Sequence, residues 1–122
     1  MSKETTVFGP LELPSGRKVK FREPTGRDRV NVIQMAKMSM ENVAGNSLLI
    51  DSYVAAKCLV EIDGKEPDPD YKRVYDMMPQ ADADFYQAVF TELFGMTDEK
   101  RASAKEAARF LRQTATSTAG SK

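Results

Sequence analysis

Residues 17–28, with the sequence RKVKFREPTGRD, contain a strand signal followed by a helix-start signal. In the first half, two apolar residues alternate with charged ones, which is the period of a half-exposed β-strand. In the second half, Pro24 disfavours helix at the residue before it, and Thr25 and Asp28 have the spacing of a capping box at a helix N-terminus. The stretch therefore predicts a strand that ends near residue 22 and a helix that begins near residue 26.

The residues before this stretch predict a second strand that pairs with the first. Residues 7–13 favour extended structure and are followed by the turn formers Pro14-Ser15-Gly16, so we expect a β-hairpin over residues 7–22. Only Val19 and Phe21 would face inward on its second strand. Because an isolated hairpin is marginal in water, the hairpin should lean on the helices as an appendage to the core.

After residue 26, apolar periodicity predicts a series of helices that reaches residue 113. The first helix carries one apolar stripe and is interrupted by Gly45-Asn46. Ser47 can cap a second helix that runs through about Glu61 and is apolar nearly all round, so it should lie in the centre. The turn formers of residues 63–70 then predict a surface loop.

Three more helical segments follow this loop. Tyr71 to Met77 is short and amphipathic. The next helix ends at Gly95 and should present one broad apolar face to the core, formed by Phe85, Tyr86, Val89, Phe90, Leu93 and Phe94. Thr97 can cap the last helix, in which charged residues lie opposite an apolar stripe of Ala104, Ala107, Ala108 and Leu111.

Together these segments predict an α+β, mainly helical protein, in which an N-terminal β-hairpin precedes a bundle of about four to five helices. At 122 residues the chain has the length of one domain, which we place at residues 1–113. The small polar residues 114–122 cannot bury enough apolar surface to offset their ordering entropy, so we expect a disordered tail there.

Charge and cysteine content argue against several classes of protein. Eighteen basic residues balance eighteen acidic ones, so no overall field draws the chain to nucleic acid or to an anionic membrane. No segment resembles a secretory signal or has the length of a membrane span. Cys58 is the one cysteine and cannot form an internal disulfide. We therefore expect a protein of a reducing cytoplasm, neither exported nor inserted into a membrane.

The sequence offers little catalytic or metal-binding chemistry. It contains no histidine, which is the commonest general base and transition-metal ligand. Asp82 and Asp84 form a carboxylate pair at a helix start, where we expect both to be solvated. The loop at residues 63–70 lacks the glycine and glutamate spacing of a calcium site, and the apolar surroundings of Cys58 favour packing over nucleophilic chemistry. We expect no enzymatic activity, no metal and no cofactor.

Two groups of residues suggest binding instead. Basic residues gather in the hairpin and the following turn, but Phe21 is the one aromatic residue among them, so a nucleic-acid-binding module is a distant alternative. These basic residues are Arg17, Lys18, Lys20, Arg22, Arg27 and Arg29. Met35, Met38 and Met40 crowd the first helix. Flexible thioethers suit both the filling of core gaps and a surface that repacks on partners, and both readings stay open.

Four short motifs follow one another along the chain: Leu13-Pro14-Ser15-Gly16-Arg17, Phe21-Arg22-Glu23-Pro24-Thr25-Gly26-Arg27-Asp28, Ile62-Asp63-Gly64-Lys65 and Phe94-Gly95-Met96-Thr97. In order and spacing they resemble the small tail assembly chaperones of long-tailed bacteriophages. The resemblance spans roughly residues 7–105, and the Arg-Glu-Pro-Thr-Gly-Arg-Asp block is its most specific piece. The methionine-rich first helix and the alanine-rich last helix do not map onto family positions.

The resemblance implies a helper in the host cytoplasm that binds the tape-measure protein, recruits tail-tube subunits and then leaves the finished tail. Self-association is left open. The alternative is a structural tail or baseplate subunit that stays in the virion. The candidate partner contacts are residues of the second strand, the first helix and the last helix, namely Arg22, Arg27, Met35, Met38, Phe110 and Leu111.

Overall fold

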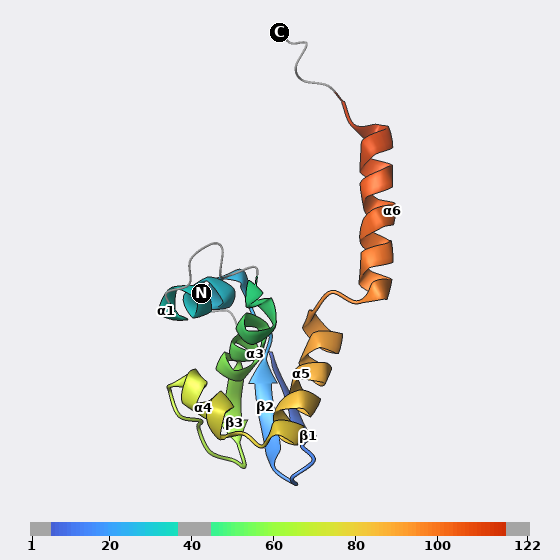
Figure 1. The fold of residues 1–122 in the computed structure, drawn as a ribbon. Coiled ribbons are helices and arrows are strands. Elements are labelled where there is room, and N and C mark those ends of the chain that lie inside the picture. Colours follow the sequence, from blue (N-terminus) through green and yellow to red (C-terminus); the bar gives the residue numbers. More distant parts are fainter. Residues whose placement is uncertain (1–5, 37–44, 117–122) are drawn as a thin grey trace, which may run out of the picture.

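The computed structural model describes residues 6–36 and 45–116 and shows an α+β, mainly helical fold (Figure 1). The predicted hairpin is present, and helices follow it. In chain order the elements are β1 (Val7–Glu12), β2 (Lys18–Arg22), α1 (Gly26–Ala36), α3 (Ser47–Lys57), β3 (Leu59–Ile62), α4 (Tyr71–Met77), α5 (Gln80–Phe94) and α6 (Asp98–Thr114).

The sheet has three antiparallel strands in the order β1-β2-β3, so the hairpin is not the whole sheet. The expectation that the second helix runs through Glu61 is wrong, because α3 ends at Lys57 and Leu59–Ile62 forms β3. In β3, Ile62 lies opposite Val19 of β2. This pairing satisfies backbone groups along β2 that a two-stranded hairpin would leave open.

The second strand of the hairpin lies at the centre of the core, which corrects its expected place as an appendage. Val19 is 1% exposed and Phe21 is 2% exposed. The ring of Phe21 meets rings from β1 and α5, with centroid distances of 5.8 Å to Phe8, 5.3 Å to Tyr86 and 6.2 Å to Phe90. Burying a large aromatic side chain is among the strongest single contributions to a core, so the hairpin is part of the fold's foundation.

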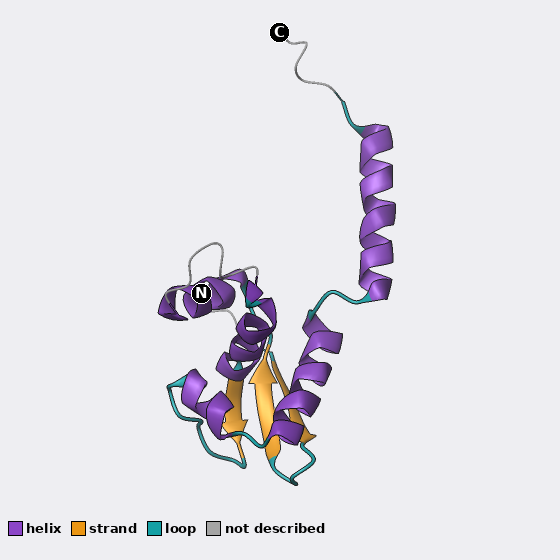
Figure 2. Cartoon of the chain, in the orientation of Figure 1, coloured by secondary structure: helices purple, strands orange, loops and turns teal. Residues whose placement is uncertain are grey.

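Helices α3 and α5 pack over the same face of the sheet, where the core residues of β2 point (Figure 2). The Tyr86 hydroxyl on α5 donates a hydrogen bond of 2.6 Å to the carbonyl oxygen of Ala55 on α3, which joins the two helices. The sequence suggested that α3 is buried nearly all round, but part of the helix is exposed. Leu48 and Leu49 in its first turn are exposed, whereas Ile50, Val54, Ala55 and Ala56 are buried.

Several local predictions agree with the structure. Helix α4 has the predicted bounds, and Gly95 follows the last residue of α5. At the start of α1, the carboxylate of Asp28 accepts a 2.8 Å hydrogen bond from the backbone N–H of Thr25, which is one half of the expected capping box. Residues 37–44, with Met38 and Met40, and most of the tail expected to be disordered lie outside the described residues.

We expect Phe21→Ala to lower the free energy of unfolding by about 3–5 kcal/mol, because the change empties the centre of the aromatic cluster. Denaturant unfolding followed by circular dichroism measures this difference. The matched control is Val7→Ala, since Val7 is exposed on β1 and its truncation should cost no more than about 0.5 kcal/mol. Equal effects of the two substitutions would contradict the central place of Phe21.

Candidate protein-binding surface

The buried carboxylate of Asp28 gathers donors from three parts of the chain. The Arg22 guanidinium donates two hydrogen bonds of 2.9 Å to its two oxygens. The Lys57 ammonium at the end of α3 lies 2.7 Å from Oδ1. The backbone N–H of Thr25 supplies a further donor. The cluster therefore ties β2, the start of α1 and the end of α3 together.

These donors fix the charge states within the Asp28 cluster. The Arg22 guanidinium, followed by the Lys57 ammonium, holds the pKa of the Asp28 carboxyl well below its usual range, although burial opposes them. Beside them, burial raises the pKa of the Cys58 thiol to about 12. A carboxylate saturated with donors is a poor base, and a protonated thiol is a poor nucleophile. The arrangement of Asp28 and Cys58 therefore serves the fold.

Asp82 is fully buried, which corrects the expectation that it is solvated. Its carboxylate accepts hydrogen bonds from the backbone N–H and the hydroxyl of Ser15, at 2.9 Å and 2.6 Å. The contact fastens the hairpin turn to the first turn of α5. Asp84, the other member of the pair, is exposed as expected. The Ser15 partner lies in a turn far along the chain, so the Asp82 position alone gave no signal of burial.

Neither a metal site nor a membrane span is found among the described residues. No group of three or more histidine, cysteine, aspartate or glutamate side chains has a geometry that could hold a metal ion there. No helix in the described ranges combines the length and apolar character needed to cross a bilayer.

Helix α6 extends clear of the sheet and the other helices (Figure 1), and none of its residues is buried. Its apolar side chains follow a helical stripe, which we call the α6 face and define as Ala104, Ala107, Ala108 and Leu111, with Phe110 at its edge. Phe110 and Leu111 are each 63% exposed. The α6 face is thus an apolar surface that the described chain leaves uncovered.

The link between α5 and α6 is held by specific contacts. The Thr97 hydroxyl accepts a hydrogen bond from the backbone N–H of Lys100, which caps α6. The Lys100 ammonium reaches back and donates to the carbonyl oxygens of Leu93 and Gly95, at 3.1 Å and 2.9 Å. A Cβ atom at Gly95 would lie 2.8 Å from the Thr91 carbonyl oxygen. These contacts close the end of α5 and direct α6 away from it.

Charge is distributed unevenly around α6. Arg109 is paired with Glu106 of the same helix at 2.9 Å. Three further basic residues lie on one side of the α6 face, and none of them has an ion-pair partner within residues 6–36 and 45–116. We call them the basic flank: Arg101, Lys105 and Arg112.

A cleft of about 510 Å³ opens beside the start of α6, which we also call the arm. It lies between the first turn of α1, helix α3 and the end of α5. Phe90, Phe94 and Met96 supply apolar lining, and Arg29 and Asp51, paired at 2.7 Å, supply polar lining. Apolar and charged side chains that line the same cleft suit an amphipathic segment of another protein.

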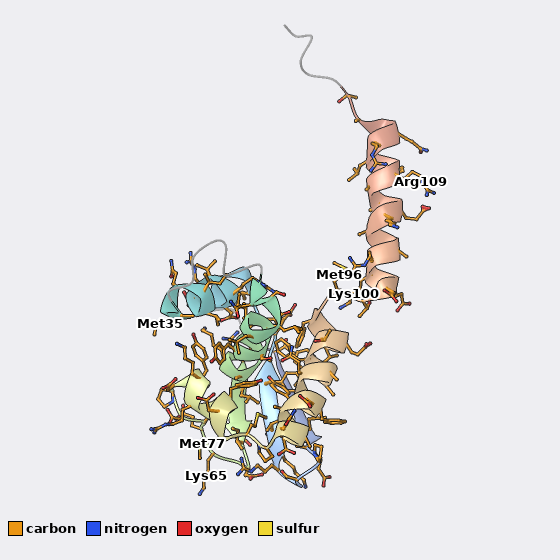
Figure 3. All side chains as sticks on the ribbon, in the orientation of Figure 1. Met35, Lys65, Met77, Met96, Lys100 and Arg109 are labelled. Carbon is orange, nitrogen blue, oxygen red and sulfur yellow. The ribbon has the colours of Figure 1, made fainter. Side chains whose placement is uncertain are left out.

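The predicted partner contacts do not form one surface. Arg22 is occupied by Asp28, whereas Arg27 is exposed in the first turn of α1. Met35 is exposed at the end of α1, far from α6 in Figure 3, where Arg109 marks that helix. Met38 lies outside the described residues, and Phe110 and Leu111 lie together on α6.

The sequence also assigned too many residues of α5 to the core. Phe85 and Leu93 are 42% and 43% exposed, whereas Tyr86 and Phe90 are buried. A helical projection separates Phe85 from Tyr86 and Phe90, whereas Leu93 follows Tyr86 by seven residues, shares its side of the helix and is exposed near the end of α5.

Comparison of the chain with models of protein families, with curated proteins and with solved structures finds no match. A function for the chain therefore has to be inferred from its geometry and from the motifs in its sequence.

We expect Asp28→Asn to lower the free energy of unfolding at neutral pH by roughly 3 kcal/mol, because it leaves the half-buried charges of Arg22 and Lys57 without a counter-ion. The folded-state pKa of Asp28 lies below its ordinary value of 3.8, so the stabilisation is complete above that value and is lost as the pH falls below it. Unfolding curves at a series of pH values measure this. Asp98→Asn, at an exposed site on α6, is the control.

A difference between wild type and Asp28→Asn that stays constant down to strongly acidic pH would contradict the depressed pKa.

The raised pKa and full burial of Cys58 predict a slow reaction with a disulfide reagent such as dithionitrobenzoate. At neutral pH the native thiol should react only as fast as the surrounding structure opens, and the denatured chain should react at once. Absorbance of the released thiolate measures both rates. Equal rates in the native and denatured states would show that the thiol is accessible.

Proposed function

We propose that this protein is a tail assembly chaperone of a long-tailed bacteriophage, acting in the host cytoplasm, which binds the tape-measure protein and recruits tail-tube subunits. The observation that carries the proposal is the α6 face, an apolar stripe on a helix that stands clear of the core. The motif string of the sequence supplies the class of client.

A short helix on its own is only marginally stable in water, and in proteins an amphipathic helix gains most of its stability by packing its apolar side against other residues. Helix α6 has 17 residues and packs no buried side chain against the described core. A partner that covers Leu111 and Phe110 would therefore stabilise the helix and remove apolar surface from water. The partner best suited to such a stripe is another amphipathic helix, with anchors at helical spacing.

The buried polar groups of the core support binding over catalysis. Asp28 is saturated with donors, Asp82 holds the Ser15 turn, and burial keeps Cys58 protonated. Each of these groups has a structural partner. The features left for function are contact surfaces, namely the α6 face and the cleft beside Phe94 and Met96.

The block that resembles the chaperone family has a structural role in this chain. Its first and last residues, Arg22 and Asp28, form the ion pair at the corner between β2 and α1. The block therefore explains how the corner folds, and client binding is assigned to other residues. Phe110 and Leu111 are the strongest candidates because they are exposed, adjacent and apolar.

A tape-measure protein is long and helical in this family of assemblies, so it offers repeated amphipathic segments that would aggregate when unprotected. A helper that covers such segments needs an exposed apolar stripe and a polar surround. The α6 face and its charged neighbours have this composition. The cleft next to Met96 lies at the base of the same arm and provides a second place for client contact.

We expect the wild-type chain, co-expressed with a tape-measure protein, to keep that client soluble and to co-purify with it. Leu111→Glu places a charge in the middle of the α6 face and should reduce the recovered client roughly tenfold, as expected for loss of a central anchor. Gln113→Glu adds the same charge on the opposite side of α6 and is the matched control. Circular dichroism checks that both variants keep their helices.

A client that is equally soluble with and without the wild-type chain would contradict the proposed function. Equal recovery with Leu111→Glu and Gln113→Glu would instead contradict the assignment to α6. Mass spectrometry of purified virions tests the structural-subunit alternative, since a chaperone is absent from the finished particle and a tail or baseplate subunit is present in stoichiometric amount.

A further inference from the structure

The side of α6 that carries the α6 face is also the side that faces the end of α5. The Lys100 ammonium donates to the carbonyl oxygens of Leu93 and Gly95 at 3.1 Å and 2.9 Å, so Lys100 marks this side. The central residues of the α6 face follow Lys100 by four, seven, eight and eleven positions, which places them on the same side of the helix. Figure 3 shows Lys100 toward α5 and Arg109 on the opposite side of α6.

The cleft beside the start of α6 opens next to the same contacts. Gly95 and Met96 line this cleft, and Gly95 also accepts the hydrogen bond from Lys100. Met96 is 58% exposed and lies two residues before α6, so it supplies apolar surface between the cleft and the α6 face. The cleft and the α6 face therefore meet at the link between α5 and α6 and form one continuous surface.

This surface has the length of a helix of several turns. Lys100 and Leu111 are eleven residues apart in α6, which corresponds to about 17 Å at the helical rise per residue. The cleft adds a volume of about 510 Å³ at one end, which is within the range of pockets that enclose small ligands. A single helix of roughly 20 residues, about 30 Å long, can lie on the α6 face and place one end in the cleft.

The two borders of the α6 face differ in charge. The basic flank lies along one border and has no ion-pair partner within residues 6–36 and 45–116. Its members Arg101 and Lys105 are four residues apart, and like charges at this spacing destabilise a helix. The other border carries uncharged residues, namely Ser103, Phe110 and Thr114. Acidic side chains of a partner beside the basic flank would relieve this repulsion and complement the apolar contact.

The small side chains of the α6 face favour a helix as its occupant over a lipid surface. Three of its four central residues are alanines, which let a second helix approach closely but bury little apolar area in a bilayer. The α6 of a second copy does not fit this role, because its borders are basic on one side and uncharged on the other. The occupant therefore needs an acidic border that α6 itself lacks.

We infer that the α6 face and the cleft form one binding site, which takes a single amphipathic helix whose apolar stripe has an acidic border on the side of the basic flank. One end of that helix enters the cleft against Phe94 and Met96, and its other end packs against Leu111. This inference deepens the proposed function, on which the identity of that helix as part of the tape-measure protein rests.

The test is isothermal titration calorimetry of the full chain with a synthetic helical peptide of roughly 20 residues, which carries a leucine stripe and glutamates along one border. One peptide should bind per chain. Met96→Glu in the link and Leu111→Glu at the far end should each weaken this one binding event at least about tenfold, as expected for loss of an anchor. Circular dichroism checks that both variants keep their helices.

A second peptide, with lysines in place of the glutamates, tests the acidic border. It should bind the wild-type chain at least about tenfold more weakly than the glutamate peptide. Arg101→Glu should weaken binding of the glutamate peptide and strengthen binding of the lysine peptide, because the charges across the contact are exchanged. Arg17→Glu makes the same charge change in the exposed hairpin turn and should leave both affinities unchanged.

Two bound peptides per chain, with Met96→Glu and Leu111→Glu each removing one of them, would overturn the single site. Equal affinity for the two peptides would overturn the acidic border. A chain that binds neither peptide overturns the whole inference, and binding to phosphatidylglycerol vesicles in that case would identify a lipid surface as the occupant of α6.

Co-expression with the tape-measure protein separates this inference from the proposed function. A chain that binds the glutamate peptide but does not keep the tape-measure protein soluble supports the inferred site and removes the proposed client. A chain that keeps the tape-measure protein soluble but does not prefer the glutamate peptide overturns the inference and leaves the proposed function intact.

Discussion

The fold depends on one buried charge, the carboxylate of Asp28. Its partners Arg22, Thr25 and Lys57 belong to the end of β2, the corner and the end of α3. The backbone N–H of Arg22 also donates to the carbonyl oxygen of Cys58 at 3.0 Å, so β3 begins where the cluster ends. An unpaired buried carboxylate would be strongly unfavourable, and these donors therefore have to converge for the sheet and its helices to assemble.

Features determined by neighbouring residues could be predicted from the sequence, whereas features determined by distant pairs could not. The hairpin turn, the bounds of α4 and the Thr97 cap each follow from a few adjacent side chains. The third strand forms because Leu59–Ile62 pairs with β2, where Ile62 lies opposite Val19. Asp82 is buried because Ser15, 67 residues away, supplies its hydrogen-bond donors. At the candidate site, the sequence named Phe110 and Leu111 as candidate partner contacts on the last helix, but it did not reveal that Asp28 binds Arg22, because that contact depends on the folded chain.

The apolar residues of the chain fall into two groups: those buried in the core around Phe21 and those exposed on α6. Around Phe21 the aromatic rings of β1, β2 and α5 enclose one another, and every buried polar side chain named above has a partner. Beyond Gly95 the pattern reverses, since α6 keeps its apolar stripe exposed and its basic flank unpaired within the described ranges. An arm built in this way is poorly stabilised by its own chain and gains most from binding.

Hydrogen–deuterium exchange on the co-purified complex with the tape-measure protein tests the central claim most directly, because it reports protection at each part of the chain. The reference is the free chain measured under the same conditions. Slowed exchange should be concentrated in residues 98–114, and the amides around Phe21 should change little because they are already protected. A complex in which α6 exchanges as fast as in the free chain, with new protection elsewhere, would contradict the role given to the arm.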